Sequence, residues 1–292
     1  MKLLTKFNLI LLVIFGAGGY VISQLAYDFL IGNARREVLE QAQLMMAAAK
    51  SVRDYTSTDL SPLLQQNPRH RVHFLAETIP AHGATTTFNN LRRDYPDYTY
   101  KEAALNPTNL EDRASDWEAD IIQNLRDHPD EVQKIGERET PSGRSLYIAK
   151  PMKATPECLQ CHSVPNAAPS AMLAVYGKNN GFGWKKNEVI AAQIISVPMS
   201  VPVAIADRAY HRLLLFLVLT LVVTIVALDA GVYFFVIGPL KVVSDTADRV
   251  SRGEKEVPPI KIKGKDEIAT VAASFNRMQV SLEKALKMIE EQ

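Results

Sequence analysis

The stretch LLLFLVLTLVVTIVALDAGVYFFVI, residues 213–237, determines how this 292-residue chain is organised. A helix needs roughly 20 mostly apolar residues to cross the hydrocarbon core of a bilayer, and this stretch contains a single charged residue, Asp229. A charged residue inside a span often marks a proton or ion site. Because Asp229 lies in the last third of the stretch, we interpret it instead as a dimer-interface or interfacial residue. We therefore expect a transmembrane helix over residues 213–237.

Apolar residues repeat at intervals of three and four in the segment that follows this helix. A first heptad seam comprises Leu240, Val243, Ala247 and Val250. After a connector over residues 253–262, Asp266 and Glu267 introduce a second seam. Its members are Ile268, Val271, Phe275, Met278, Leu282, Ala285 and Ile289. Such seams are buried between packed helices, so the pattern predicts two amphipathic helices.

These two helices, with Pro239 at the membrane junction and Glu267 opening the second helix, resemble the HAMP domain. The resemblance implies a homodimer whose helices form a parallel four-helix bundle, and a two-state relay through small rotation or tilt of packed helices. A purely structural coiled-coil stalk has the same heptad pattern and remains the alternative. Residues 239–292 are thus interpreted as a HAMP domain and the start of a signalling helix. No kinase, cyclase or methyl-accepting pattern follows, so we expect a separate cytoplasmic effector or a helix that continued into one.

A second apolar run, residues 7–31, lies near the N-terminus and is long enough to span a membrane. A cleaved signal peptide is the alternative, because residues 9–15 form a short apolar core followed by small residues at 16–19. The apolar run continues well beyond that core, so we expect the segment to be retained as a transmembrane helix. Residues 1–6 then form a short cytoplasmic N-terminus.

The region between the two spans, residues 32–210, has the pattern of an α+β domain. Residues 34–55 are rich in Ala, Glu, Gln, Met and Leu without Gly or Pro, which predicts a long helix continuing from the membrane. Helical character returns at residues 116–125. Runs typical of strands follow at residues 145–149, 172–176 and 189–198. Helices outside a central antiparallel sheet suit this order, in a shape resembling a PAS-type fold.

The two cysteines of the chain fall in one pentapeptide, Cys158-Leu159-Gln160-Cys161-His162. C-x-x-C-H is the attachment signature of c-type haem. The two thiols add across the vinyl groups, and the adjacent histidine reaches the iron. We therefore predict one covalent haem c, held by Cys158 and Cys161, with His162 as an axial ligand. Because this haem type is attached outside the cytoplasm, residues 32–210 are expected in the periplasm, with both termini in the cytoplasm.

Two other uses of paired cysteines are less consistent with the sequence. A structural zinc site needs four ligands, often from two C-x-x-C pairs, and no second pair exists here. A thioredoxin-like C-x-x-C is expected at a helix start near a βαβ pattern. The residues before Cys158, Ala-Thr-Pro-Glu, instead indicate a loop.

Four strings resemble the c-type haem-binding sensor domain first described from cyanobacteria, over most of residues 34–200. They are residues 74–103 (FLAETIPAHGATTTFNNLRRDYPDYTYKEA), 106–121 (NPTNLEDRASDWEADI), 157–169 (ECLQCHSVPNAAP) and 181–199 (GFGWKKNEVIAAQIISVPM). The resemblance implies a PAS-like fold, the same haem attachment and a role in redox sensing. In that family a cysteine serves as the second axial ligand. This chain departs from the pattern because it has no third cysteine.

The second axial position decides whether the iron binds a gas or only exchanges electrons. The candidates are His70, His73, His82, His128, Met152, Met172 and Met199. We place His82 first, because it lies between Pro80 and Gly83 inside a family-like string, and His73 second. Each of these histidines is also explained by an ordinary surface or hydrogen-bonded position.

Taken together, the sequence predicts a two-pass protein of a bacterial inner membrane that senses redox state or a diatomic gas outside the cytoplasm. Its HAMP domain would relay that state to a cytoplasmic partner, and we expect no enzymatic activity. The alternative is a membrane-tethered monohaem c-type cytochrome for electron transfer, which needs no heptad-patterned cytoplasmic bundle. With 33 basic and 32 acidic residues, the chain has no cationic field of the kind that binds nucleic acid. Its expected contacts are membrane lipid, a second copy of itself and the effector.

Overall fold

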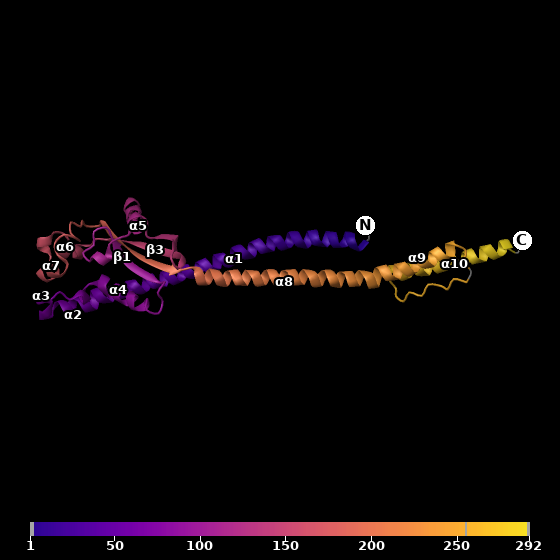
Figure 1. Cartoon of the computed structure of the whole chain (residues 1–292), viewed down its shortest axis with the longest axis horizontal. Coiled ribbons are helices and arrows are strands. Elements are labelled where there is room, and N and C mark those ends of the chain that lie inside the picture. The colour runs from indigo at the N-terminus through magenta and orange to yellow at the C-terminus, as the bar shows by residue number, and fades with distance from the viewer. Residues whose placement is uncertain (1–2, 255, 291–292) are drawn as a thin grey trace. The chain divides into compact units, whose positions relative to one another are not determined.

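The computed structural model describes residues 3–254 and 256–290, which divide into two compact units. One unit is Tyr27–Tyr210, and the other combines Met1–Ala26 with His211–Gln292. Figure 1 labels the α-helices of both units and two strands of the sheet, β1 and β3. Two helices, α1 (Leu3–Tyr55) and α8 (Ser200–Val232), run from one unit into the other. Each unit is described by itself.

A four-stranded antiparallel sheet forms the centre of the unit Tyr27–Tyr210. The strands are β1 (Thr99–Ala104), β2 (Lys134–Thr140), β3 (Gly143–Lys153) and β4 (Val189–Pro198), in the spatial order β1-β4-β3-β2. Every residue of β4 is buried except the half-buried Gln193. A strand buried along its length must have both of its faces covered, and this one has helices on both sides. The expected α+β fold class, with apolar helices flanking the domain, is confirmed.

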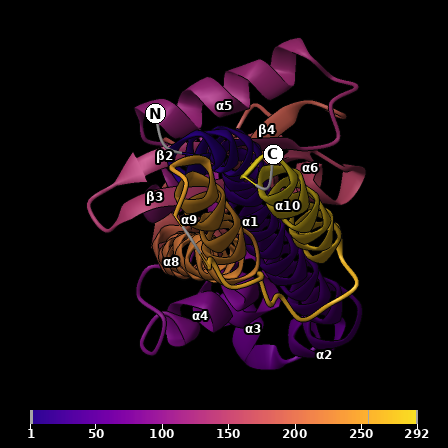
Figure 2. The ribbon, with the colours of Figure 1, turned by 90° about the vertical axis from the view of Figure 1, so that its right-hand side faces the viewer.

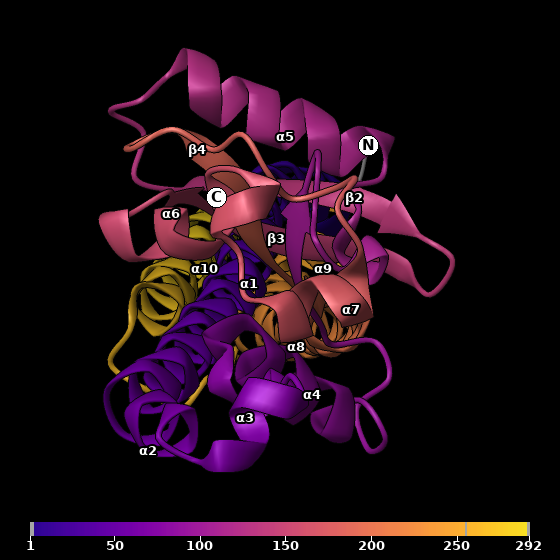
Figure 3. The same cartoon turned by 90° about the vertical axis from the view of Figure 1, so that its left-hand side faces the viewer.

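Alternate side chains of β4 enter two separate cores. Ile195 and Val197 pack with α1 and with α4 (Pro80–Leu91) on one face. Ile194 and Ala192 pack with α5 (Asp116–Asp127) on the other face. Figure 3 shows α5 and α4 on opposite sides of the sheet. This alternation follows from the two-residue period of a strand, and it fixes α1 firmly to the sheet.

The longest connection of the sheet, between β3 and β4, carries three short helices. They are α6 (Pro156–His162), the 3₁₀ helix η4 (Pro165–Ala167) and α7 (Ser170–Tyr176). After α1 the chain forms a π-helical turn η1 (Thr56–Leu60), then α2 (Ser61–Gln65), α3 (Pro68–Val72) and the 3₁₀ turn η2 (Ala76–Thr78). Another 3₁₀ turn, η3 (Leu110–Asp112), follows β1. The C-x-x-C-H motif therefore lies in the long connection between β3 and β4, beside one end of the sheet.

Two local predictions were wrong. Residues 172–176 form the end of α7 and not a strand, because Ala, Met and Leu are strong helix formers and no neighbouring strand pairs with them in the described part of the chain. Cys158 lies in helix α6 and not in a loop, since Pro156 occupies a first-turn position that suits proline. The helices predicted at 34–55 and 116–125 and the strands at 145–149 and 189–198 are confirmed.

The other unit contains the two apolar helical stretches and the C-terminal helices. Both stretches are long and apolar enough to cross a membrane, and neither is buried inside the chain, unlike the core helix of a soluble protein. After α8 come the π-helical turn η5 (Tyr233–Ile237), α9 (Gly238–Ser251) and α10 (Glu267–Glu290). Helix α10 begins at Glu267 as predicted, and Asp266 Oδ1 accepts a 2.8 Å hydrogen bond from the backbone N–H of Ala269, which caps the helix.

The connector between α9 and α10 is fastened to α10 by two amide side chains. Asn276 bonds both the backbone N–H and the carbonyl of Ile260, at 2.8 and 2.9 Å, and Gln279 Nε2 donates to the carbonyl of Val257 at 2.8 Å. Val257 and Ile260 are buried. Figure 2 shows α9 and α10 side by side with the connector looping between them. Several apolar residues of α10, including Val271 and Met278, are exposed in the single chain.

Candidate functional site

Helix α6 presents the two thiols on one side. Cys158 and Cys161 are three positions apart, which places their side chains on the same helix face. Both are half-buried and neither is in a disulfide. Burial, and to a lesser extent the neighbouring Cys158, raises the pKa of the Cys161 thiol. The pair therefore offers two half-buried thiols with fixed spacing on one helix face.

His162 ends α6, and its ring is held in one orientation. Its Nδ1 lies 2.7 Å from the carbonyl oxygen of Gly181 and 3.3 Å from Oγ1 of Thr108. A carbonyl oxygen can only accept, so Nδ1 carries the hydrogen and the lone pair of Nε2 is free. Burial lowers the pKa of His162, although the hydrogen bond to Gly181 acts in the opposite direction. A neutral imidazole whose Nδ1–H is anchored by a backbone carbonyl is the usual state of a metal-ligating histidine.

Trp184 fixes the plane of the His162 ring. The two rings are stacked, with centroids 4.0 Å apart and planes 13° from parallel. The backbone adds two hydrogen bonds, from Trp184 N–H to the His162 carbonyl (3.3 Å) and from Gly183 N–H to the Ser163 carbonyl (2.9 Å). Behind the motif, Leu159, Trp184 and Met152 pack against a small buried cluster. The cluster comprises Ala104, Ala154, Ile190 and Ala191.

Gly181 is the point at which three segments of the site meet. Its φ angle is +79°, its N–H donates to Asn106 Oδ1 at 3.3 Å, and its carbonyl accepts from His162. A Cβ atom at this position would lie 1.9 Å from Oγ1 and 2.9 Å from Cα of Thr108. Only glycine fits here, both for its backbone conformation and for the close approach of Thr108.

We expect Gly181→Ala to destabilise this region more than a glycine substitution at a similar φ angle. Gly177 has φ +78° and ψ −168°, a region that residues other than glycine rarely adopt, and a Cβ added there would have no atom within 4 Å, so Gly177→Ala carries only the backbone cost of about 1–3 kcal/mol. Gly181→Ala adds the clash with Thr108, for a total of about 2–4 kcal/mol. Urea unfolding of the two variants measures the difference. Equal losses of unfolding free energy would contradict the described packing of Gly181 against Thr108.

A carboxylate near the site has a strongly shifted pKa. Burial, followed by the negative charges of Glu102 and Glu111, raises the pKa of Asp112 to about 6. Burial and the charges of Asp112 and Glu111 also raise the pKa of the Tyr176 hydroxyl. The loop that supplies Thr108 therefore continues into an acidic segment that faces α7.

The structure places the candidates for a second axial ligand in different parts of the domain. His82, in α4, and His73, at the end of α3, are both exposed, and the side chain of His70 lies outside the described part of the chain. His128 ends α5, where its Nδ1 lies 2.9 Å from the Asn124 carbonyl. Met172 is buried in α7 and Met152 is half-buried beside Leu159. Within residues 3–254 and 256–290, no hydrogen bond or ring contact joins His82 or His73 to α6.

Two of these candidates can be ordered by their neighbours. The backbone N–H of Met199 donates a hydrogen bond to the carbonyl of Arg144, at the start of β3. Helix α6 follows the other end of that strand, which is roughly 30 Å away at about 3.3 Å per residue. Phe74, next to His73, packs edge-on against Tyr176 of α7 at 5.7 Å. Met199 is thus remote from the motif, whereas the segment beside His73 contacts the connection between β3 and β4 that contains the motif.

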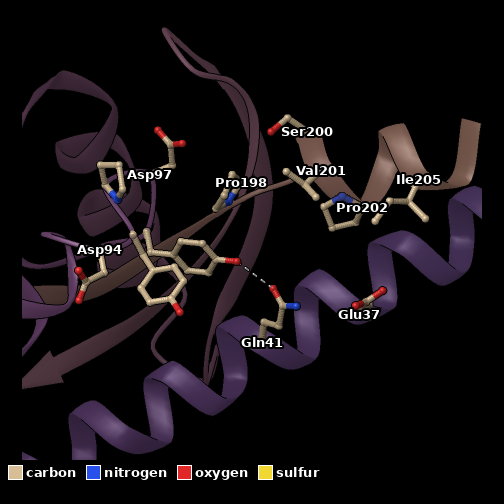
Figure 4. A pocket seen from close by; sticks show the side chains of 12 residues that line it. Glu37, Gln41, Asp94, Asp97, Pro198, Ser200, Val201, Pro202 and Ile205 are labelled. Carbon is tan, nitrogen blue, oxygen red and sulfur yellow. Dashed lines mark hydrogen bonds between the residues drawn. The ribbon is translucent and has the colours of Figure 1, made fainter. Parts of the chain in front are cut away.

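A surface groove of about 430 Å³ lies in another part of the domain, at the start of α8 (Figure 4). Tyr98 in this groove donates a hydrogen bond to Gln41 of α1 at 3.4 Å. The acidic residues Glu37, Asp94 and Asp97 and the apolar Val201 and Ile205 also line it. None of the motif residues lines it, so the groove is separate from the thiol–imidazole site.

The sequence predicted the motif but not the residues that orient it. Thr108, Gly181 and Trp184 lie 54, 19 and 22 positions from His162 and have no spacing rule of their own. The available signal was their presence in the strings at residues 106–121 and 181–199. Because Cys158 lies in the first turn of α6, a loop no longer excludes a thioredoxin-like helix start. The antiparallel sheet, however, offers no βαβ unit for such a motif.

Comparison with known proteins places two domains on the chain. The family model Tll0287-like matches residues 32–198, and the HAMP domain model matches residues 234–284. A solved structure, that of the cyanobacterial heme-protein Tll0287, aligns over 56% of this chain and 95% of its own, with 10% identity and a TM-score of 0.43. No curated protein matches the chain. Because the first family model covers more than half of the sequence, the chain belongs to the Tll0287-like family, and a HAMP domain follows its family domain.

Proposed function

We propose that this protein is a membrane-bound sensory transducer that carries one covalent c-type haem outside the cytoplasm. It senses redox state or a diatomic gas and relays that state through HAMP to a cytoplasmic partner. HAMP domains transmit signals, so a signalling role for the chain follows from its family matches. The single observation that carries the haem assignment is the geometry of α6, where a Nδ1-anchored imidazole stands beside two thiols on one helix face.

The residues of the site fit a c-type haem. Cys158 and Cys161 would form the two thioether bonds, and Nε2 of His162 would bind the iron. The Gly181 carbonyl and the Trp184 ring would hold the imidazole in place, as outer partners of a metal-bound histidine do. When bound, the haem would supply a one-electron redox centre with an iron that can take a further ligand. We propose no catalytic role for the chain.

For the second axial ligand we propose His82 first and His73 second. His82 comes first because it lies in the family-like string at residues 74–103, and its side chain is exposed in α4. The contact between Phe74 and Tyr176 supports His73 as well, because Phe74 follows His73 directly and Tyr176 lies in the β3–β4 connection that bears the motif. Either ligand gives the iron two protein ligands and favours redox sensing over gas binding.

The proposed topology has two passes. The match to HAMP and the two unburied apolar helices indicate an integral membrane protein. We place the haem domain in the periplasm and both termini in the cytoplasm, in the inner membrane of a bacterium, since haem of this type is attached outside the cytoplasm. HAMP domains often work as dimers, and the exposed apolar residues of α10 support a homodimer.

Both membrane helices are attached to the sheet that borders the site. Strand β4 ends at Pro198 and α8 starts at Ser200, so a shift of β4 is passed directly to α8. On the other side, Arg53 of α1 forms an ion pair with the buried Glu102 of β1, whose side chain is 4% exposed. This arrangement supports a relay in which movement in the connection between β3 and β4 reaches α1 and α8 together.

The alternative, a membrane-tethered monohaem cytochrome for electron transfer, would use the same thiols and histidine. It leaves the HAMP match unexplained, because a tether needs no signalling module. The presence of that module is why we propose a sensor.

The absorption spectrum of the purified full chain tests this function. We expect a low-spin spectrum in both the oxidised and the dithionite-reduced states, unchanged by carbon monoxide or nitric oxide, because two protein ligands occupy the iron. His82→Ala should then produce a gas-binding form, and if it does not, His73→Ala should. A wild-type ferrous form that takes up gas would overturn redox sensing in favour of gas sensing. A chain without any haem spectrum would overturn the proposal.

A further inference from the structure

Two polar side chains meet in the apolar part of the unit that contains the membrane helices. Asn8 lies in α1 and Asp229 in α8, and Asn8 Nδ2 donates a hydrogen bond of 2.9 Å to Asp229 Oδ2. Asp229 thus has a partner within its own chain, which the sequence did not predict. A polar pair between two membrane helices is sparingly used and often functional.

The second oxygen of each side chain has no partner among the described residues. Asn8 Oδ1 and Asp229 Oδ1 are both buried, and neither forms a hydrogen bond. If Asp229 were ionised, its charged Oδ1 would be buried in an apolar environment without a hydrogen-bond donor. The amide oxygen of Asn8 could not help, because it can only accept. These two unpaired oxygens belong to side chains that already share one hydrogen bond, so one added hydrogen could satisfy both.

We infer that Asn8 and the protonated form of Asp229 make a reciprocal carboxylic acid–carboxamide pair that clasps α1 to α8. Asp229 Oδ1–H donates to Asn8 Oδ1, while Asn8 Nδ2–H donates to Asp229 Oδ2. The single proton, taken up from solvent, gives both unpaired oxygens a hydrogen bond. Buried polar groups are almost always satisfied in this way, so the closed pair is the arrangement that the buried atoms require.

Charged groups on the two helices do not compete for this pair. On α1 the nearest described one is Lys6, which is exposed and lies two positions, about 200°, around the helix from Asn8. Lys2 lies outside the described residues. Beyond Asp229, Tyr233 is 55% exposed and packs against Phe234, and the first charged residue is Lys241 in α9.

The clasp sits directly before the signalling module. Asp229 precedes the π-helical turn η5, and α9 begins immediately after that turn. Farther along the same helices, a Cβ at Gly19 would lie 3.1 Å from Leu217 Cδ2, so the two spans pack closely there as well. Two contacts thus join α1 to α8 in this unit, and the Asn8–Asp229 pair lies just before the turn that leads from α8 into α9. This inference goes beyond the haem assignment and does not depend on it.

Infrared spectroscopy of the full chain in lipid nanodiscs, with ¹³C-labelled aspartate side chains, tests the pair. At neutral pH we expect a carboxylic-acid C=O band that disappears in Asp229→Asn and persists in the matched control Asp28→Asn, an exposed position of α1. Asn8→Leu should shift the band, because the amide partner is lost. Absence of the acid band in the wild type, or a band that Asn8→Leu leaves unchanged, would overturn the inference.

A double-mutant cycle gives an independent measurement. Asn8→Leu, Asp229→Leu and the double variant should show a coupling of roughly three- to fifteen-fold in the unfolding equilibrium constant, the range found for hydrogen bonds between membrane helices. Asp229→Asn should keep most of the stability, because two amides can also form two reciprocal hydrogen bonds. Additive effects of the two leucine substitutions would contradict the clasp.

Discussion

The double variant Cys158→Ala/Cys161→Ala is expected to lose covalently bound haem completely, while each single variant keeps a reduced amount through one remaining thioether. The two thiols lie on the same face of α6 and are the only cysteines in the chain, so no other side chain can form the linkage. Haem-stained denaturing gels, quantified against an immunoblot of the full chain from cells that mature c-type cytochromes, measure the ratio of haem to protein.

Gln160→Ala is the matched control for these variants. Gln160 lies between the two cysteines in α6, is exposed, and contributes no atom to the proposed linkage. Its haem-to-protein ratio should equal that of the wild type. A haem-stained band in the double variant, or its absence in the wild type, would show that the motif does not attach haem.

His162→Ala is expected to change the state of the iron while leaving the haem attached. The proposed thioethers would not depend on the imidazole, but the proposed nitrogen ligand, which Gly181 and Trp184 orient, would be lost. The low-spin spectrum should therefore be replaced by a high-spin one, and added imidazole should restore it by filling the vacated space. Absorption spectra during an imidazole titration measure both effects.

His128→Ala serves as the control for this variant. His128 is exposed at the end of α5 and bonds the Asn124 carbonyl, away from α6. Its spectrum should match that of the wild type. If His162→Ala also kept the wild-type spectrum, another residue would be the axial ligand.

The parts of the fold that the sequence predicted are those set by composition over many residues. The apolar stretch at 213–237 and the glycine-free segment at 34–55 indicate helices by length and helix propensity alone. The two heptad seams predicted the HAMP helices in the same way, and Asp266 marks the start of α10 because its side chain caps the helix. Patterns of this kind persist whatever the tertiary contacts are.

The parts that the sequence did not predict depend on contacts between distant segments. Residues 172–176 contain Val and Tyr and were expected as a strand, yet they pair with no strand in the described part of the chain and instead continue a short helix from Ser170. The motif itself was visible from five consecutive residues, but Thr108 and Gly181 gain their roles only where two loops cross His162. The pairing of Asn8 with Asp229 spans 221 positions and likewise depends on how the helices pack.

Hydrogen–deuterium exchange of the full chain in nanodiscs, compared between the oxidised and reduced states, tests the central claim that the state of the haem domain reaches HAMP. We predict that reduction changes exchange both in the connection between β3 and β4 and in the HAMP connector around Val257 and Ile260, whose backbone groups Gln279 and Asn276 bind. The double cysteine variant should show neither change. Exchange that changes in residues 154–188 while the connector stays identical in the two states would contradict the relay.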